Sequence, residues 1–236
     1  MGSSSSKDKN IENKITKENS IISKNKNVEN KITKENSIIS KNKNVENKMT
    51  KEKSLLINEI NELRKKPKEY IKKLIKNKQY FKNGTKIWRY PDKVQIKTEE
   101  GPAAYDEAID FLKNKAVAVK ELTPSKGLNN IALDFLKEFQ RDENSNIEME
   151  PIIYNHGDFS GDFRRLVKFG YNTPEHIVVN LVVSDGDKSR GQRNALLSDK
   201  LNRIGVAQGK HDLYGECCII VACTIFENNN NDKNIL

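Results

Sequence analysis

Apolar residues recur every three or four positions along several stretches of this chain, the spacing that places them on one face of a helix. On this pattern four helices are predicted, over residues 54–66, 67–78, 103–118 and 127–141. Pro67 separates the first two, and we expect it to break or restart the helix because proline has no backbone N–H to donate.

Two more helices are predicted from the residues at which they start. The run 173–175, Thr-Pro-Glu, provides an N-cap, a first-turn proline and an acidic first turn, and predicts a helix that continues through Val183. The other predicted helix begins at Ser160 and ends near Gly170.

Unbroken runs of β-branched and other apolar residues predict strands near the C-terminus, over residues 203–208 and 216–226. The run 152–154, Ile-Ile-Tyr, predicts a third strand. An order of helices followed by late strands favours the α+β class.

All three cysteines fall in the predicted strand 216–226. Because side chains alternate along a strand, we expect Cys217 and Cys223 on one face and Cys218 on the other. Neighbours along one strand are poor disulfide partners. The sequence also lacks a Cys-x-x-Cys pair with a nearby histidine, the pattern that would indicate a zinc site. We therefore expect buried free thiols, which are typical of a reducing compartment.

The first 56 residues differ in kind from the rest of the chain. A 17-residue unit occupies residues 7–23, returns at 24–40 and appears again, diverged, at 41–57. At about 100° per residue its Ile and Val positions spiral around a helix, so no continuous coiled-coil face is expected. The composition favours a disordered or transiently helical linker, and a solvated helix is the alternative.

Length and composition set the domain organisation. The chain has 236 residues, of which 35% are hydrophobic, enough for one good core but hardly for two. We expect a low-complexity arm rich in Lys and Asn over residues 1–53, one globular domain over 54–227, and a disordered Asn-rich tail over 228–236.

Positive charge is concentrated in the arm. Residues 1–53 hold 13 lysines and 7 acidic residues, and therefore most of the net charge of +9. The arm has neither arginines nor aromatic residues, so a nucleic-acid partner is not expected. The remaining interpretations are a weak attraction to an anionic membrane surface and a linker that Lys and Asn keep soluble.

The chain opens with Met-Gly-Ser-Ser-Ser-Ser-Lys, which matches the N-myristoylation pattern with Gly2 as the lipidation site. An expression-tag scar is the alternative. One myristoyl chain anchors a protein only marginally, so the Lys-rich repeats are a candidate second membrane signal. No secretory signal or membrane-spanning run is recognisable, and we expect a cytoplasmic, membrane-associated protein that is not secreted.

Four motifs in order resemble those of the CAP superfamily (cysteine-rich secretory proteins, antigen 5 and pathogenesis-related proteins). They lie at residues 61–67, 100–112, 157–161 and 191–206, and the last reads Gly-Gln-Arg, Asn-x-Leu and Ile-Gly-Val. The resemblance covers roughly residues 54–226, and the motif at 100–112 is similar to the second helix of a cytosolic-looking subgroup. It implies a three-layer α-β-α sandwich.

In that family two histidines and two acidic residues line a cavity that can hold a divalent ion. The resemblance places Phe135 and Gln192 where the family has histidines, and Arg165 near one of the acids. Phenylalanine has no lone pair to offer and an amide is a poor zinc ligand. We therefore expect no metal and no cofactor.

Three other residues are candidates for this degenerate ligand groove. His156 lies beside the glycine motif, Asp185 precedes the basic turn, and Arg193 follows Gln192. Each also has an ordinary structural interpretation. His156 is then a hydrogen-bonded or exposed histidine, Asp185 a turn residue, and Arg193 a surface charge.

Catalysis has little support in the sequence. There is no G-x-S-x-G elbow, and the cysteines lie in a hydrophobic run rather than in an electropositive setting. The prediction is a non-enzymatic CAP-type domain that binds a lipid or a protein partner at the cytosolic face of a membrane. The alternatives are a degenerate hydrolase or protease of the same family, and a structural spacer in which the repeats are the functional part.

Overall fold

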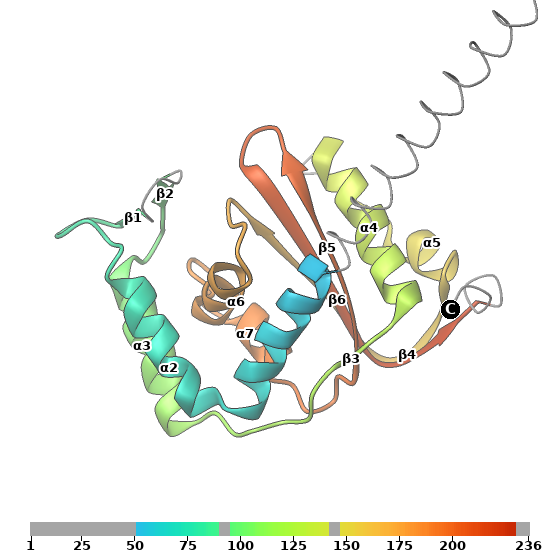
Figure 1. Ribbon diagram of the computed structural model, residues 1–236, viewed down its shortest axis with the longest axis horizontal. Helices are drawn as coiled ribbons and strands as arrows, with labels where there is room; N and C mark the ends of the chain where they lie inside the picture. The colour runs from blue at the N-terminus through green and yellow to red at the C-terminus, as the bar shows by residue number, and fades with distance from the viewer. Residues whose placement is uncertain (1–50, 90–94, 142–146, 230–236) are drawn as a thin grey trace, which may run out of the picture. The chain divides into compact units, whose positions relative to one another are not determined.

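The structure is a computed structural model, and it describes residues 51–89, 95–141 and 147–229 (Figure 1). The predictions made for the repeat arm up to residue 50, including Gly2, and for the last seven residues of the tail lie outside these ranges.

Helices of the described part occur before, between and after the strands. A helix that ends at residue 65 comes first. The others are α2 (Pro67–Lys78), α3 (Pro102–Asn114), α4 (Lys126–Arg141), α5 (Met149–Tyr154), α6 (Pro174–Val183) and α7 (Gly191–Leu196). The break at Pro67 is as predicted, because Lys66 separates the first two helices.

Four strands form the main sheet in the order β3-β5-β6-β4. They are β3 (Thr123–Pro124), β4 (Gly157–Phe169), β5 (Arg203–His211) and β6 (Gly215–Asn228), and a separate small sheet joins β1 (Ile87–Trp88) to β2 (Ile96–Lys97). Strand β3 runs parallel to β5, whereas the two long pairs with β6 are antiparallel. In those pairs Ile220 lies opposite Val206 of β5 and Leu166 of β4.

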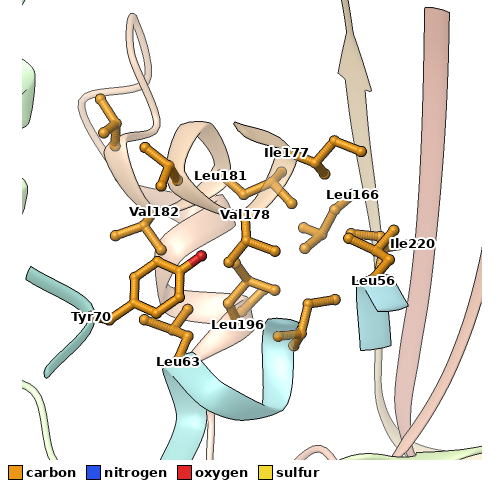
Figure 2. Close-up of a cluster of buried hydrophobic side chains, with 14 of the residues drawn as sticks. Leu56, Leu63, Tyr70, Leu166, Ile177, Val178, Leu181, Val182, Leu196 and Ile220 are labelled. Atoms are coloured by element: carbon orange, nitrogen blue, oxygen red, sulfur yellow. The ribbon is translucent and has the colours of Figure 1, made fainter. Parts of the chain in front are cut away.

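The sheet separates two hydrophobic clusters. On one face the helix at 51–65, α2, α3, α6 and α7 pack together, and Figure 2 shows Leu56 and Leu63 near Val178, Leu196 and Ile220 of this cluster. The other face is covered by α4 and α5 (Figure 1). Because each face of an apolar sheet must be covered, the result is an α-β-α sandwich. The predicted α+β class and three-layer arrangement are confirmed.

Strand β6 is buried on both faces in its central part, as its apolar run predicted. Cys217 and Cys223 face α4, and Cys218 faces the other helices, which confirms the predicted alternation. All three are free, buried thiols. Burial raises the pKa of Cys217 and of Cys223 to about 12, and raises that of Cys218 further.

We expect these thiols to be inert in the folded protein, because the thiolate is the reactive form and burial suppresses it. At pH 8 a disulfide reagent should modify the native chain at least about a hundredfold more slowly than the chain unfolded in guanidinium, which should yield three equivalents. Rapid native labelling of even one cysteine would contradict the burial of β6.

The helix predicted from Ser160 to Gly170 is wrong, because residues 157–169 form strand β4. After a register shift between Ser160 and Phe163, the side chains of β4 alternate. Phe163 and Val167 pack toward α4, and Leu166 joins the opposite cluster. Charged residues at intervening positions obscure this period of two in the sequence, as is usual for an edge strand.

The strand predicted at residues 152–154 is also wrong, because Ile153 lies in the short helix α5. A run of three apolar residues does not distinguish a strand from one buried helical turn. The helix predicted to reach residue 118 ends at Asn114 instead. The following residues, 116–122, belong to no helix or strand, and Val119 donates its backbone N–H to the carbonyl of Arg64 at 2.9 Å.

The remaining predictions of secondary structure are confirmed. Helix α4 matches the predicted range to one residue, and α6 begins where Thr173 accepts a hydrogen bond from the backbone N–H of His176 at 3.2 Å. Strands β5 and β6 are each slightly longer than predicted. No helix of the described residues is long and apolar enough to span a bilayer.

Candidate functional site

The turn that follows α6 is held by the Asp185 carboxylate. Its two oxygens accept the backbone N–H groups of Glu99, Glu100 and Gly101, at 2.6, 2.9 and 3.3 Å. Ser184 ends the helix in the left-handed conformation, with φ of 50°. Asp185 therefore joins two segments more than eighty residues apart, whereas its alternative interpretation was a local turn residue.

Arg190 and Glu100 form a bidentate ion pair across the same junction. The Nη1 to Oε1 distance is 2.5 Å and the Nη2 to Oε2 distance is 2.7 Å. The hydrogen bond from Arg190 is the main reason that the pKa of Glu100 falls to about 2. Arg190 also lies 3.1 Å from a carboxylate oxygen of Glu107, so its charge is already matched.

Arg193 is buried, with 1% of its surface exposed. Its Nε donates to the carbonyl of Val182 at 2.6 Å, and its two terminal nitrogens donate to Glu107 at 2.8 and 2.5 Å. The guanidinium also lies 4.8 Å from the centre of the Phe111 ring. Arg193 is thus a core cation that fastens α7 to α3 and α6, and not the surface charge that was considered as an alternative.

Gln192, at the place of a family histidine, lies on α7 and is half-buried. Its Oε1 is buried and has no hydrogen-bond partner in the described part of the chain. A buried amide oxygen without a hydrogen bond lowers the stability of the folded state. Position 192 therefore has a buried polar oxygen, but not the imidazole that the resemblance implies there.

Phe135 and Arg165 meet on the other face of the sheet. Phe135 is fully buried on α4, and the guanidinium of Arg165 on β4 lies 4.8 Å from the centre of its ring and 5.2 Å from that of Phe139. Burial lowers the pKa of Arg165. Its Nη1 is buried and has no hydrogen-bond partner among the described residues.

His156 lies in the turn between α5 and β4, where its Nε2 is 2.7 Å from a carboxylate oxygen of Asp134 on α4. Burial raises the pKa of Asp134, but hydrogen bonds from His156 and Lys137 outweigh it, and the pKa lies below its usual range. The pair links α4 to the turn before β4. Asp185, by contrast, belongs to the junction with residues 99–101.

The six candidate groove residues do not share one cavity. Phe135, His156 and Arg165 lie on the α4 side of the sheet, whereas Asp185, Gln192 and Arg193 lie with the helices of the opposite layer. Within residues 51–89, 95–141 and 147–229, no three His, Cys, Asp or Glu side chains converge as metal ligands would. The six residues therefore fall into two groups of three, on opposite faces of the sheet that contains β4 and β6.

Two of the best-connected polar residues were not predicted to have a role. Arg64 is completely buried and donates to the carbonyls of Lys120, Leu196 and Leu201, at 2.7, 2.6 and 3.2 Å. Glu107 is the counterion of Arg193. Both stand in the motifs that resemble the CAP superfamily, which was the signal available in the sequence.

Comparisons with known proteins give two partial likenesses. No family model and no curated protein matches the sequence. The structure is similar to an outer surface protein from Borrelia burgdorferi, with 11% identity, a TM-score of 0.38, and coverage of 47% of this chain and 80% of that one. It is also similar to a cysteine-rich secretory protein from Staphylococcus aureus, with 17% identity, a TM-score of 0.36, and coverage of 52% of this chain and 38% of that one.

Proposed function

We propose that this chain is a non-catalytic α-β-α domain that acts by binding a lipid or a protein partner, tethered to the cytosolic face of a membrane through acylated Gly2. The observation that carries the first part is the stack of Arg165 on Phe135. An aromatic ring and a cation fill the positions where the resemblance implies an imidazole and an acid. Neither group binds a divalent cation, and the guanidinium repels one.

The surroundings of the other polar groups support the same proposal. A hydrolase needs a nucleophile or a general base within reach of a substrate. The thiols are buried with raised pKa values, and the carboxylates of Glu100, Glu107 and Asp185 accept hydrogen bonds from arginines or the backbone. These groups are used to hold the fold together.

Tethering rests on the sequence around Gly2 and on the charge of the arm. A single myristoyl chain gives reversible attachment, and thirteen lysines in residues 1–53 supply a dilute electrostatic attraction to anionic lipid. The alternative proposal, a degenerate hydrolase, predicts turnover of general esterase or protease substrates. Absence of turnover together with a lipid or protein that copurifies in stoichiometric amount distinguishes binding from hydrolysis.

Metabolic labelling of the full chain tests the anchor. We expect incorporation of labelled myristate and a protein divided between membrane and cytosol, because one chain anchors only marginally. The Gly2→Ala variant should be unlabelled and wholly soluble, and Ser3→Ala is the matched control that should retain the label. Raising the salt concentration should lower the membrane fraction by screening the lysines. An unlabelled wild-type chain would remove the anchor from the proposal.

A further inference from the structure

Strand β4 forms one edge of the main sheet. It is 13 residues long and pairs with β6 on one side, and in the described part of the chain no other strand pairs with its outer side. Alternate backbone N–H and C=O groups of an edge strand point away from the sheet. Such a row can receive another extended segment by strand addition.

The side chains on one face of β4 are only partly covered. Helix α4 packs mainly against β5 and β6. Phe159, Phe163, Val167 and Phe169 therefore pack against the edge of the α4 cluster and remain half-buried. A strand added beside β4 would extend this face and cover these side chains.

The second half of β4, from Phe163 to Phe169, carries three cations and no acidic residue. Arg164 has a side chain 53% exposed, and its carboxylate partner, Asp162, is 3.7 Å away. Arg165 has the unpaired Nη1, and the Lys168 ammonium lies 5.9 Å from the centre of the Tyr171 ring, with no ion pair to a described residue. Burial lowers the pKa of Lys168 to about 8, and the nearby charge of Asp185 opposes this shift.

A second copy of the chain is a poor occupant of this edge. The regular part of β4 follows the register shift, and antiparallel pairing of two such parts about Leu166 sets Arg164 of each copy against Lys168 of the other. Like charges directly opposite destabilise a strand pair. Pairing about Phe163 matches Asp162 with Arg164, but it runs through the irregular segment, where a bulge interrupts the ladder.

We propose that the segment Phe163–Phe169 is a docking site for an extended, acidic peptide segment of a partner protein, which adds to the sheet beside β4. Acidic side chains of the peptide lie beside Arg164 and Lys168, and apolar side chains lie beside Phe163 and Val167 on the opposite face. Backbone hydrogen bonds supply the pairing, and the alternation of charge and apolar surface supplies specificity. This inference rests on the proposed binding role and names the class of partner.

A labelled peptide of sequence Glu-Val-Glu-Val-Glu-Val-Glu, blocked at both ends, tests the site by fluorescence anisotropy with the full chain at pH 7. We expect saturable binding that is at least tenfold weaker when every Glu is replaced by Lys. Replacing the central Val by Pro should weaken it to the same extent, because proline removes a backbone donor without changing the charge.

Variants of the protein locate the site. The double variant Arg164→Glu with Lys168→Glu should weaken binding at least fivefold, whereas Lys115→Glu, an exposed charge at the end of α3, should change it less than twofold. Hydrogen exchange on the wild-type chain should show added protection within residues 163–169, a measurement that does not require the double variant to fold.

Three results would overturn the proposal. They are absence of saturable binding by the acidic peptide, equal binding of the proline or lysine peptide, and protection that falls outside β4. If any of these occurs while the chain still takes up myristate and retains a copurifying lipid, the peptide site is lost and the proposed function stands. Turnover of esterase substrates would instead contradict the proposed function itself.

Discussion

The Gly205→Ala variant is expected to lose the native fold or to be destabilised by more than about 4 kcal/mol. A methyl group at Gly205 would lie 2.0 Å from the backbone carbonyl carbon of Leu128 and 2.3 Å from the nitrogen of Asn129. Strand β5 and helix α4 touch through their backbones here, so no side-chain rotation relieves the contact. Either α4 must move off the sheet or β5 must leave its register.

Denaturant unfolding followed by circular dichroism measures this effect. Gly191→Ala is the matched control, because its added methyl meets only side-chain oxygens of Asp187 and Ser189, both at 3.3 Å, and we expect a change of less than about 1 kcal/mol. A Gly205→Ala protein as stable as the wild type would show that α4 does not approach β5 this closely.

Arg64→Met is expected to destabilise the protein by about 3 kcal/mol. Methionine fills similar volume but leaves the carbonyls of Lys120, Leu196 and Leu201 without their donor. Each buried group left unpaired costs about 1–3 kcal/mol, and the release of a buried charge offsets part of this total. Burial alone lowers the pKa of Arg64 to about 10 despite the nearby charge of Asp199.

Chemical denaturation of Arg64→Met beside Arg203→Met tests the assignment, because Arg203 is exposed on β5 and its replacement should change stability by less than about 0.5 kcal/mol. Arg64→Lys should fall between wild type and Arg64→Met, since one ammonium does not reach all three carbonyls. If the two methionine variants unfold at the same denaturant concentration, Arg64 does not hold these segments together.

Strong periodicity made α4 and β6 predictable from the sequence. In α4 four large apolar residues recur at helical spacing, and in β6 the run is continuous. Strand β4 was not recognised because Phe163, Arg165 and Val167 mix apolar and charged residues on one face. That mixture is stable there because an edge strand is only partly covered by α4.

The candidate site was predicted less well than the fold, for a different physical reason. Sequence motifs identified Asp185 and Arg193 as residues of interest, but their partners are 84 to 86 positions away. Which carboxylate meets which donor is decided by the packing of α3 against α6 and α7. The contact between Phe135 and Arg165 requires residues 157–169 to form a strand, whereas the sequence predicts a helix from Ser160.

Calorimetric titration of the full chain with zinc chloride tests most directly the central claim, that the domain has no site for a divalent ion. We predict no saturable heat, because the described ligand-type side chains do not converge and the Phe135 ring lies against the guanidinium of Arg165. In a separate thermal unfolding experiment, added zinc should leave the melting temperature unchanged, since an ion that binds only the native state must raise it. Saturable binding of one zinc ion per chain, abolished by His156→Ala or Asp185→Asn, would contradict this claim.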